Sequence, residues 1–459
     1  MGIHRLLHPL AGALAGPWSL DISCQPVASG CGAPRKHIWH TGFLPLYRIS
    51  CYLAFASAVT ILLNLTASET LLALSWIALV ASRAKLRLPR IWLPLGLFLA
   101  GTVLSLVFSP SPMHGLVQMK KILVYSVLMV IFSTVRDVAT ARRLIQSWSA
   151  VAAAVAVLGM VQFAQKWHEA HVLHVDFYQF YVTDRVTGTM RHWMTFAGQE
   201  MMVLLMLLAF LCFARSDRRS VWIWSACALL LGTVLLLNET RTVWLGTAVA
   251  GAWLLWWWNR WAAAVGPVAI VLFVWLVPGP AHDRFVSIFH PQKDIDSNEF
   301  RRIAFRTGLR MIEAHPFLGI GLDETKYHFL DYLPPDTPRP LPPGFYQHLH
   351  NFYLQFAAER GIPTMLMMLW MLFLILYDFF HALRKLPAGP GDARFLLHGG
   401  IAAVIGIMVS GLFEVNLNDS AVLTVFLIVV ACGYVAVVAP VVLPPAPIAP
   451  GGAGAEQSI

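Results

Sequence analysis

Apolar stretches of near-membrane length recur along the chain and restrict its fold more than any other feature. They occupy residues 43–65, 67–82, 91–109, 119–135, 143–165, 196–214, 220–238, 242–258, 261–277, 351–382, 394–414 and 419–439. Most approach the ~20 residues that a helix needs to cross a bilayer. Only 12% of the residues are charged, against about 25% in soluble proteins. The sequence therefore excludes a soluble enzyme with one packed core and predicts an all-α polytopic membrane protein with about twelve transmembrane helices.

The remaining segments divide the chain into five predicted parts. Residues 1–42 are expected to form an N-terminal cytoplasmic extension, and residues 440–459, rich in Pro, Gly and Ala, a flexible cytoplasmic tail. Spans 1–9 fill 43–277, a long helical periplasmic loop fills 278–350, and spans 10–12 fill 351–439. The tenth run is too long for one perpendicular crossing, so a break is expected at Gly361 and Pro363, where glycine and proline interrupt a helix.

The positions of Lys and Arg predict the orientation. They gather in alternate connections, at 83–90, 136–143, 215–219, 260 and 384–394, whereas the short connections near 66, 110–118 and 415–418 have none. Because cytoplasmic loops carry the positive charge, both termini are expected in the cytoplasm. The formal charge of +9 is thereby explained without nucleic-acid binding. Segments 166–195, 239–241 and 278–350 then face outward.

Two outward segments carry arginine where basic residues are otherwise scarce. Residues 238–242 form a tight polar hairpin that holds Glu239 and Arg241. The two could simply pair with each other, but an ionisable pair at a membrane is a functional hypothesis by default. Arg185 and Arg191 precede the sixth span, and they could either reach lipid headgroups or belong to a site.

A basic helix is predicted within the long outward loop. Arg302, Arg306 and Arg310 recur every four residues, with Arg301 on the flank of this stripe. The stripe could rest on anionic headgroups, which we favour for Arg306 and Arg310, or one arginine could turn inward to bind phosphate. The preceding segment 294–296 matches the DxD pattern of metal-dependent glycosyltransferases, but a helix cap explains it better.

Histidines and acids stand close to the last spans. His348 and His350 precede the tenth run, and Asn351 is expected to cap its helix. A zinc site is disfavoured because no third ligand lies near in sequence. Glu414 and Asp419 flank the last outward turn, where they are placed to orient a cation or a histidine. No cofactor or metal is predicted.

Two longer motifs complete the pattern, HPFLGIG at 315–321 and HNFYLQFAAERGIP at 350–363. Together with the arginine hairpin and the many spans, they resemble the O-antigen ligase / O-antigen polymerase superfamily of bacterial envelope glycosyltransferases, and the ligases most of all. The resemblance implies a GT-C-like membrane fold in the bacterial inner membrane, with an active site that faces the periplasm. It implies transfer of a glycan from undecaprenyl diphosphate to the lipid A–core oligosaccharide.

The resemblance also assigns roles. It places Arg241, Arg301, His350 and an arginine before the middle span, preferably Arg191, in the catalytic set. Phe305 stands where the family has Trp, which leaves Arg301 or Arg302 open. The other residues expected to contact substrate are Arg185, Arg302, Glu239, His348, Asn351, Glu414 and Asp419.

The chemistry is reasonable without the family. Arginine forks stabilise a departing diphosphate without a metal, and an imidazole can accept the proton of the attacking hydroxyl. Rival hypotheses are an O-antigen polymerase, a protein O-oligosaccharyltransferase and, less favoured, a lipid-linked glycan flippase. A flippase should carry its charges along a central cavity, whereas here they gather in outward loops.

Overall fold

The computed structural model describes residues 44–276, 280–287, 289–290, 298–341, 344 and 346–439, and these ranges contain helices but no strand. The two predicted terminal segments and the DxD pattern at 294–296 lie outside them. Twelve longer helices match the twelve apolar runs, one helix to each run: α2 (Leu44–Thr60), α3 (Leu65–Ala81), α4 (Trp92–Val107), α6 (Lys121–Thr134), α7 (Val138–Val172), α9 (Trp193–Phe213), α10 (Arg218–Leu237), α11 (Arg241–Trp258), α12 (Arg260–Leu276), α16 (Phe352–Lys385), α17 (Asp392–Ser410) and α18 (Ser420–Val438).

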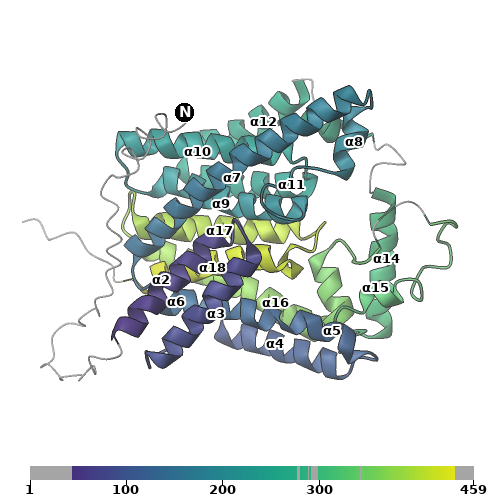
Figure 1. Cartoon of the computed structure of the whole chain (residues 1–459), viewed down its shortest axis with the longest axis horizontal. Helices are drawn as coiled ribbons and strands as arrows, with labels where there is room; N and C mark the ends of the chain where they lie inside the picture. Colours follow the sequence, from purple (N-terminus) through teal and green to yellow (C-terminus); the bar gives the residue numbers. More distant parts are fainter. Residues whose placement is uncertain are drawn as a thin grey trace, which may run out of the picture.

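Shorter helices and one basic amphipathic helix occupy the connections. They are α5 (Pro112–Met119), α8 (Phe177–Thr183), α13 (Pro280–Val286), α14 (Asn298–Ala314), α15 (Thr325–His328) and the 3-10 helix η1 (Asn416–Asn418). Helix α14 runs across the end of the bundle rather than along it (Figure 1). The helix predicted in the outward loop is therefore present.

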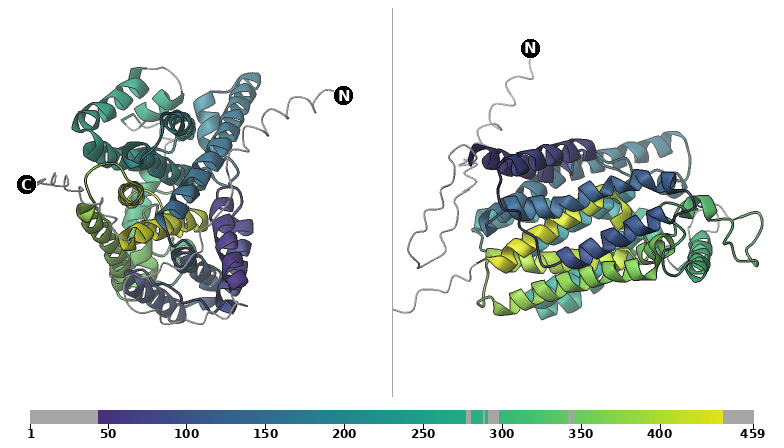
Figure 2. Two further views of the ribbon diagram at one scale, coloured as in Figure 1. Left: turned by 90° about the vertical axis from the view of Figure 1, so that its left-hand side faces the viewer. Right: turned by 90° about the horizontal axis from the view of Figure 1, so that it is seen from below.

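The prediction of an all-helical, multi-pass membrane protein is confirmed. Within the described residues, seven helical segments are long and apolar enough to cross a membrane, and α3 and α4 are shorter apolar helices. The count of twelve crossings stays a prediction. Helices α9, α17 and α18 lie at the centre of the bundle (Figures 1 and 2), where side chains such as Met201, Val404 and Phe426 are fully buried.

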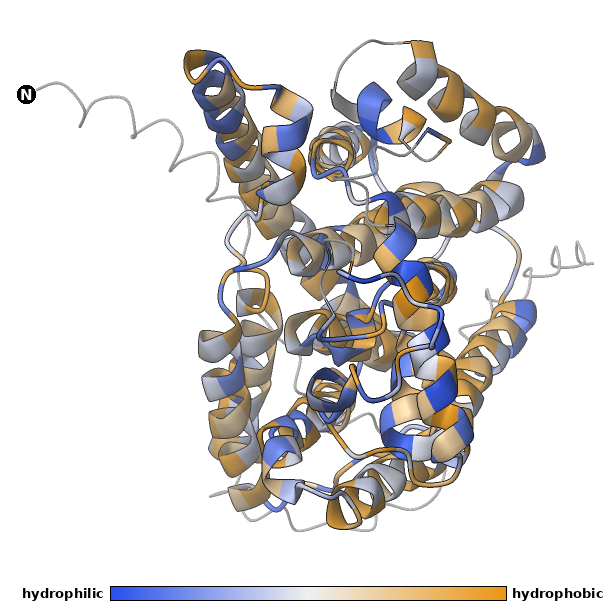
Figure 3. Cartoon of the chain, turned by 90° about the vertical axis from the view of Figure 1, so that its right-hand side faces the viewer, coloured by the Kyte–Doolittle hydropathy of each residue, from blue (hydrophilic) through white to orange (hydrophobic). Residues whose placement is uncertain are grey.

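Alternate connections lie at opposite ends of the bundle, as antiparallel neighbours require. At one end, Arg142 forms an ion pair with Asp392 at 2.8 Å. At the other end, the Thr189 hydroxyl donates to the Leu62 carbonyl at 2.9 Å, joining the outward segment 166–195 to the end of the first apolar run. This second end carries α14 and α15 (Figure 1), and hydrophilic residues gather near its centre (Figure 3). Its exposure to the periplasm stays a prediction.

The break predicted in the tenth run is present. Helix α16 is interrupted at Gly361, where φ is +81°, and Pro363 has no N–H with which to continue the hydrogen-bond ladder. The carbonyls at 358–359 instead accept hydrogen bonds from the N–H groups of Ile320, at 2.8 Å, and Gly321, at 3.2 Å. The two sequence motifs therefore bind each other through backbone groups, and this contact fixes the outward loop against α16.

We expect Gly361→Ala to lower the free energy of unfolding by at least about 2 kcal/mol, because a side chain at positive φ is strained. Its Cβ would also lie 2.0 Å from the Phe317 carbonyl oxygen. The matched control is Gly251→Ala in α11, where nothing lies within 4 Å, and this change should be neutral or slightly stabilising. The melting temperatures of the two purified variants test this, and equal values would contradict it.

Candidate active site

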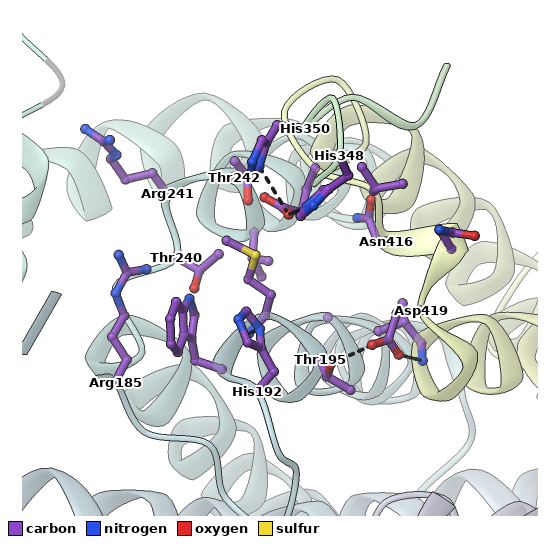
Figure 4. A pocket seen from close by; sticks show the side chains of 18 of the residues that line it. Arg185, His192, Thr195, Thr240, Arg241, Thr242, His348, His350, Asn416 and Asp419 are labelled. Carbon is purple, nitrogen blue, oxygen red and sulfur yellow. Dashed lines mark hydrogen bonds and ion pairs between the residues drawn. The ribbon is translucent and has the colours of Figure 1, made fainter. Parts of the chain in front are cut away.

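A cavity of about 720 Å³ opens among the connections at the end of the bundle that carries α14. Its walls come from the start of α9, the hairpin before α11, helices α13 and α14, the segment before α16 and the turn between α17 and α18. Figure 4 shows Arg185 and Arg241 on one side, Asn416 and Asp419 on the other, and His348 and His350 between them.

Three arginines form one side of the cavity. The buried Arg185 and Arg284 both donate to the Glu239 carbonyl oxygen, from Nη1 at 3.3 Å and from Nε at 3.1 Å. Arg241 donates from Nη1 to the carbonyl oxygen and Oγ of Ser287, at 3.2 and 3.1 Å. Glu239 has a φ of +55°, an uncommon conformation for a residue other than glycine. The strained hairpin thus supplies one carbonyl that orients two guanidinium groups.

The carboxyl group of Glu239 does not neutralise this cluster. It is buried, and neither oxygen has a hydrogen-bond partner. Burial raises the pKa of Glu239, and the charges of Arg185 and Arg284 oppose this rise without cancelling it. Burial, followed by repulsion from Arg284, lowers the pKa of Arg185. Buried like charges that repel each other in this way are stabilised by a bound anion.

Glu414 brings the other charged residues together. Its carboxylate lies 3.6 Å from the Arg301 guanidinium, 3.7 Å from His348 Nε2 and 3.8 Å from His350 Nδ1. Asn351 lies next to this cluster. It caps α16 by accepting a hydrogen bond from the Leu354 N–H at 2.9 Å, and its side-chain amide donates to the Leu412 carbonyl at 3.0 Å. The predicted cap therefore also ties the histidines to the turn that carries Glu414.

The protonation of this cluster follows from its contacts. Burial raises the pKa of Glu414, but a hydrogen bond from His350 and the charge of Arg301 lower it further than burial raises it. Glu414 is therefore an anion. Burial, with repulsion from His350, lowers the pKa of His348 to about 4. His350 has a φ of +52°, so it is held, like Glu239 behind the arginines, in a strained conformation.

The pKa of His348 predicts a pH-dependent stability. Between its ordinary value of 6.5 and about 4, the unfolded chain binds a proton that the folded chain does not. Stability should therefore fall as the pH is lowered through this window, by at most about 3 kcal/mol. We expect His348→Gln to flatten the fall in melting temperature between pH 6.5 and 4 relative to wild type. Parallel curves for the two proteins would contradict this.

One known protein family matches the part of the chain that includes several residues of the cavity. Residues 226–369 match the family model described as O-antigen ligase. These residues therefore resemble an O-antigen ligase domain. No curated protein matches the chain. The matched segment includes Arg241, Arg301 and His350, so the resemblance found in the sequence is confirmed. It ends before Glu414, and it begins after Arg185.

The structure brings most of the predicted site residues to one cavity. Those that line it are Arg185, Arg241, Arg301, His348, His350, Glu414 and Asp419. Glu239 lies buried behind the arginines. Arg191 and Arg302 are exposed and are not among the lining residues, and Asn351 acts as a helix cap. Of the two arginines before α9, Arg185 thus lines the cavity and Arg191 does not.

Sequence reasoning missed several polar residues of the cavity. Arg284 is the most notable, because it is buried and donates from Nη1 to the Tyr178 hydroxyl at 2.9 Å. The available signal was an arginine just beyond the ninth apolar run, on the face that is poor in Lys and Arg. His192, Lys326 and Asn416 also line the cavity. They come from segments whose sequence shows no motif.

Arg306 and Arg310 have partners within the protein. Arg306 makes a bidentate ion pair with Asp336, with both N···O distances 2.9 Å, and Arg310 Nη1 donates to the Leu333 carbonyl at 2.6 Å. The preferred interpretation was contact with lipid headgroups. The structure instead shows that these arginines fasten the 333–336 segment to α14.

One group of residues in the described part of the chain could hold a metal. His348, His350 and Glu414 offer ligand atoms that all lie within 4.8 Å of one another. Glu414, which is distant in the sequence, is therefore brought next to the two histidines by folding and is a candidate third ligand. The nearby charges of Arg301 and the three arginines oppose a cation there, and they favour an anion.

Proposed function

We propose that the protein is an O-antigen ligase, a metal-independent, inverting glycosyltransferase. It transfers the glycan from undecaprenyl diphosphate to a sugar hydroxyl of lipid A–core at the periplasmic face of the bacterial inner membrane. The observation that carries the proposal is the juxtaposition, in one cavity, of buried arginines with a histidine pair held by a carboxylate. The match of residues 226–369 to the O-antigen ligase family model supports the reaction class.

The arginine side suits the diphosphate of the donor. Arg185 and Trp193 line the cavity, and each has a buried side-chain N–H without a partner, at Nε and Nε1. The carbonyl of Glu239 already fixes Arg185 and Arg284, so little reorganisation is needed when charge develops on the leaving group. Preorganised donors in a site screened from water stabilise such charge strongly.

The histidine–carboxylate cluster suits activation of the acceptor. His350 accepts the proton as the acceptor hydroxyl attacks the anomeric carbon from the side opposite the diphosphate. The glycosyl–oxygen bond to the diphosphate breaks in the same step, so the anomeric configuration inverts without a glycosyl-enzyme intermediate. Glu414 serves as a positioning residue, since an anion beside an imidazole stabilises the imidazolium that forms.

Two of the rival hypotheses differ from the ligase in the acceptor, and the third, a flippase, catalyses no glycosyl transfer. A polymerase or a protein O-oligosaccharyltransferase would use the same arginines and histidine. A flippase needs no base, and the buried arginine and histidine groups at one end of the bundle favour an enzyme. Purified protein incubated with lipid-linked glycan and either rough lipopolysaccharide or a protein acceptor tests the proposal. Product on the lipopolysaccharide alone would support the ligase, and product on the protein or on a second lipid-linked glycan would overturn it.

We expect transfer to persist in excess EDTA, because arginines rather than a cation stabilise the departing diphosphate. The measurement compares initial rates with and without the chelator, and after addition of Mg²⁺, Mn²⁺ or Zn²⁺. Loss of transfer in EDTA with rescue by one of these ions would assign His348, His350 and Glu414, or the acidic residues at 294–296, as metal ligands instead.

A further inference from the structure

We propose that the side of the cavity formed by Asp323, Asn416, Asn418 and Asp419 is the acceptor subsite, which binds the hydroxyl groups of the accepting sugar. This inference rests on the proposed function and adds to it the location of the second substrate. The four residues line the same cavity as the arginines. Figure 4 shows Asn416 and Asp419 across the cavity from Arg185 and Arg241, beyond the two histidines.

The charge of this side differs from that of the arginine side. Its carboxylates are Asp323 and Asp419. Asp323 forms an ion pair with Lys326 at 2.7 Å, whereas Asp419 accepts hydrogen bonds from neutral groups, the Thr195 hydroxyl and two backbone N–H groups. The Asp419 carboxylate repels a diphosphate, whereas a carboxylate accepts hydrogen bonds from neutral hydroxyl groups and an amide both accepts and donates them. The charges therefore favour one arrangement of the substrates, with the donor diphosphate at the arginines and an uncharged sugar face at these residues.

The side also has an acceptor atom without a partner. Asn416 is buried, and its Nδ2 donates to the Ser410 hydroxyl at 2.6 Å, but its Oδ1 has no hydrogen-bond partner. An unpaired buried carbonyl is unfavourable, and a sugar hydroxyl would satisfy it. On the opposite side, the partnerless atoms include the N–H donors of Arg185 and Trp193, alongside the Thr242 hydroxyl and the carboxyl oxygens of Glu239 behind the arginines. The unused hydrogen-bonding capacity of the cavity therefore matches an anion on one side and a hydroxyl donor on the other.

The remaining polar groups of this side are held rigidly. Lys121 Nζ donates to Asn418 Oδ1 at 2.7 Å. Asp419 caps α18 by accepting from the N–H groups of Ala421 and Val422, and its other oxygen accepts from the Thr195 hydroxyl at 2.7 Å. Asp323 has a φ of +67°, a conformation that persists only where its surroundings enforce it. Preorganised groups of this kind lose little entropy when a sugar binds.

Asp419→Asn tests the subsite. Asparagine caps a helix as well as aspartate does, so the variant should fold, while it loses the charged acceptor. With rough lipopolysaccharide as acceptor, we expect the acceptor KM to rise roughly tenfold, as for loss of a hydrogen bond to a charged group. Binding of undecaprenyl diphosphate, the donor probe, should stay within about twofold of wild type. Asn416→Ala is the second variant, with a rise of about threefold expected.

Two further variants serve as controls. Arg185→Lys should show the opposite result, weaker binding of undecaprenyl diphosphate with an unchanged acceptor KM. Asp331→Asn removes an acid that pairs with His328 at 2.9 Å and does not line the cavity, so neither quantity should change.

Each outcome decides between the hypotheses. An unchanged acceptor KM in both Asp419→Asn and Asn416→Ala, or weaker donor binding instead, would overturn the acceptor subsite and leave the ligase intact. Absence of transfer by wild type to rough lipopolysaccharide would overturn the ligase, and with it this inference.

Discussion

We expect His350→Ala to bind the lipid-linked donor and yet to transfer glycan about 10²–10⁴ times more slowly than wild type, the usual effect of removing a general base. His350 is buried, lies 3.8 Å from the Glu414 carboxylate and stands between the two sides of the cavity. Its removal leaves the arginines in place, so the diphosphate should still bind. Transfer rates at matched expression and the Kd of undecaprenyl diphosphate give the two readouts.

His348→Ala is the internal control for this prediction. His348 lies as close to Glu414 as His350 does, but its low pKa makes it a weak base at neutral pH. We therefore expect it to keep most of the activity. The anomeric configuration of the product, determined by NMR, adds a second test. A fully active His350→Ala, or a product that retains the configuration of the donor, would end the mechanism.

The fold was largely predictable because each membrane-spanning helix requires a long apolar run, which is easily recognised in the sequence. Each apolar run coincides with a helix, and the break at Gly361 follows from Gly and Pro chemistry. The orientation inferred from the alternation of Lys and Arg stays a prediction. The sequence did not show why Gly361 is needed. At the break in α16, the backbone carbonyls at 358–359 accept hydrogen bonds from N–H groups of the 315–321 motif. This contact joins segments that are far apart in the chain.

The site was predictable where a local motif carried it and not elsewhere. Arg241 and His350 stand in short signatures, and both line the cavity. Arg185 and Arg191 are six positions apart in one loop, and no local rule says which side chain faces inward. Gly188, at a φ of +57°, lies between them in a turn that is closed by a hydrogen bond from the Met190 N–H to the Thr187 carbonyl at 2.9 Å.

Long-range pairs explain the other differences. Arg284 is identified only when α13 packs against the hairpin, because its partners are Glu239 and Tyr178. Arg306 follows the pattern of a headgroup-binding stripe, yet its partner, Asp336, stands 30 positions further along the chain. The contact of Glu414 with the histidines likewise joins segments that are more than 60 residues apart.

We expect Arg241→Lys to lose transfer nearly as severely as Arg241→Ala, on the order of 10²-fold, comparable to the loss of one donor to a developing negative charge. Arg241 lies on the arginine side, and Ser287 fixes one end of its guanidinium through Nη1. A lysine ammonium is a point charge without the planar fork, so it cannot keep the Ser287 contacts and grip a phosphate at the same time.

Arg306→Ala is the matched control, because it removes an arginine of the same outward end that is exposed and bound to Asp336. An exposed ion pair contributes little to stability, so transfer should stay within a few-fold of wild type. Initial rates and undecaprenyl diphosphate binding for the three variants decide the matter. Equal losses in Arg241→Ala and Arg306→Ala would mean that general positive charge, rather than an oriented guanidinium, holds the donor. Full rescue by lysine at 241 would lead to the same conclusion, since charge without the fork would then suffice.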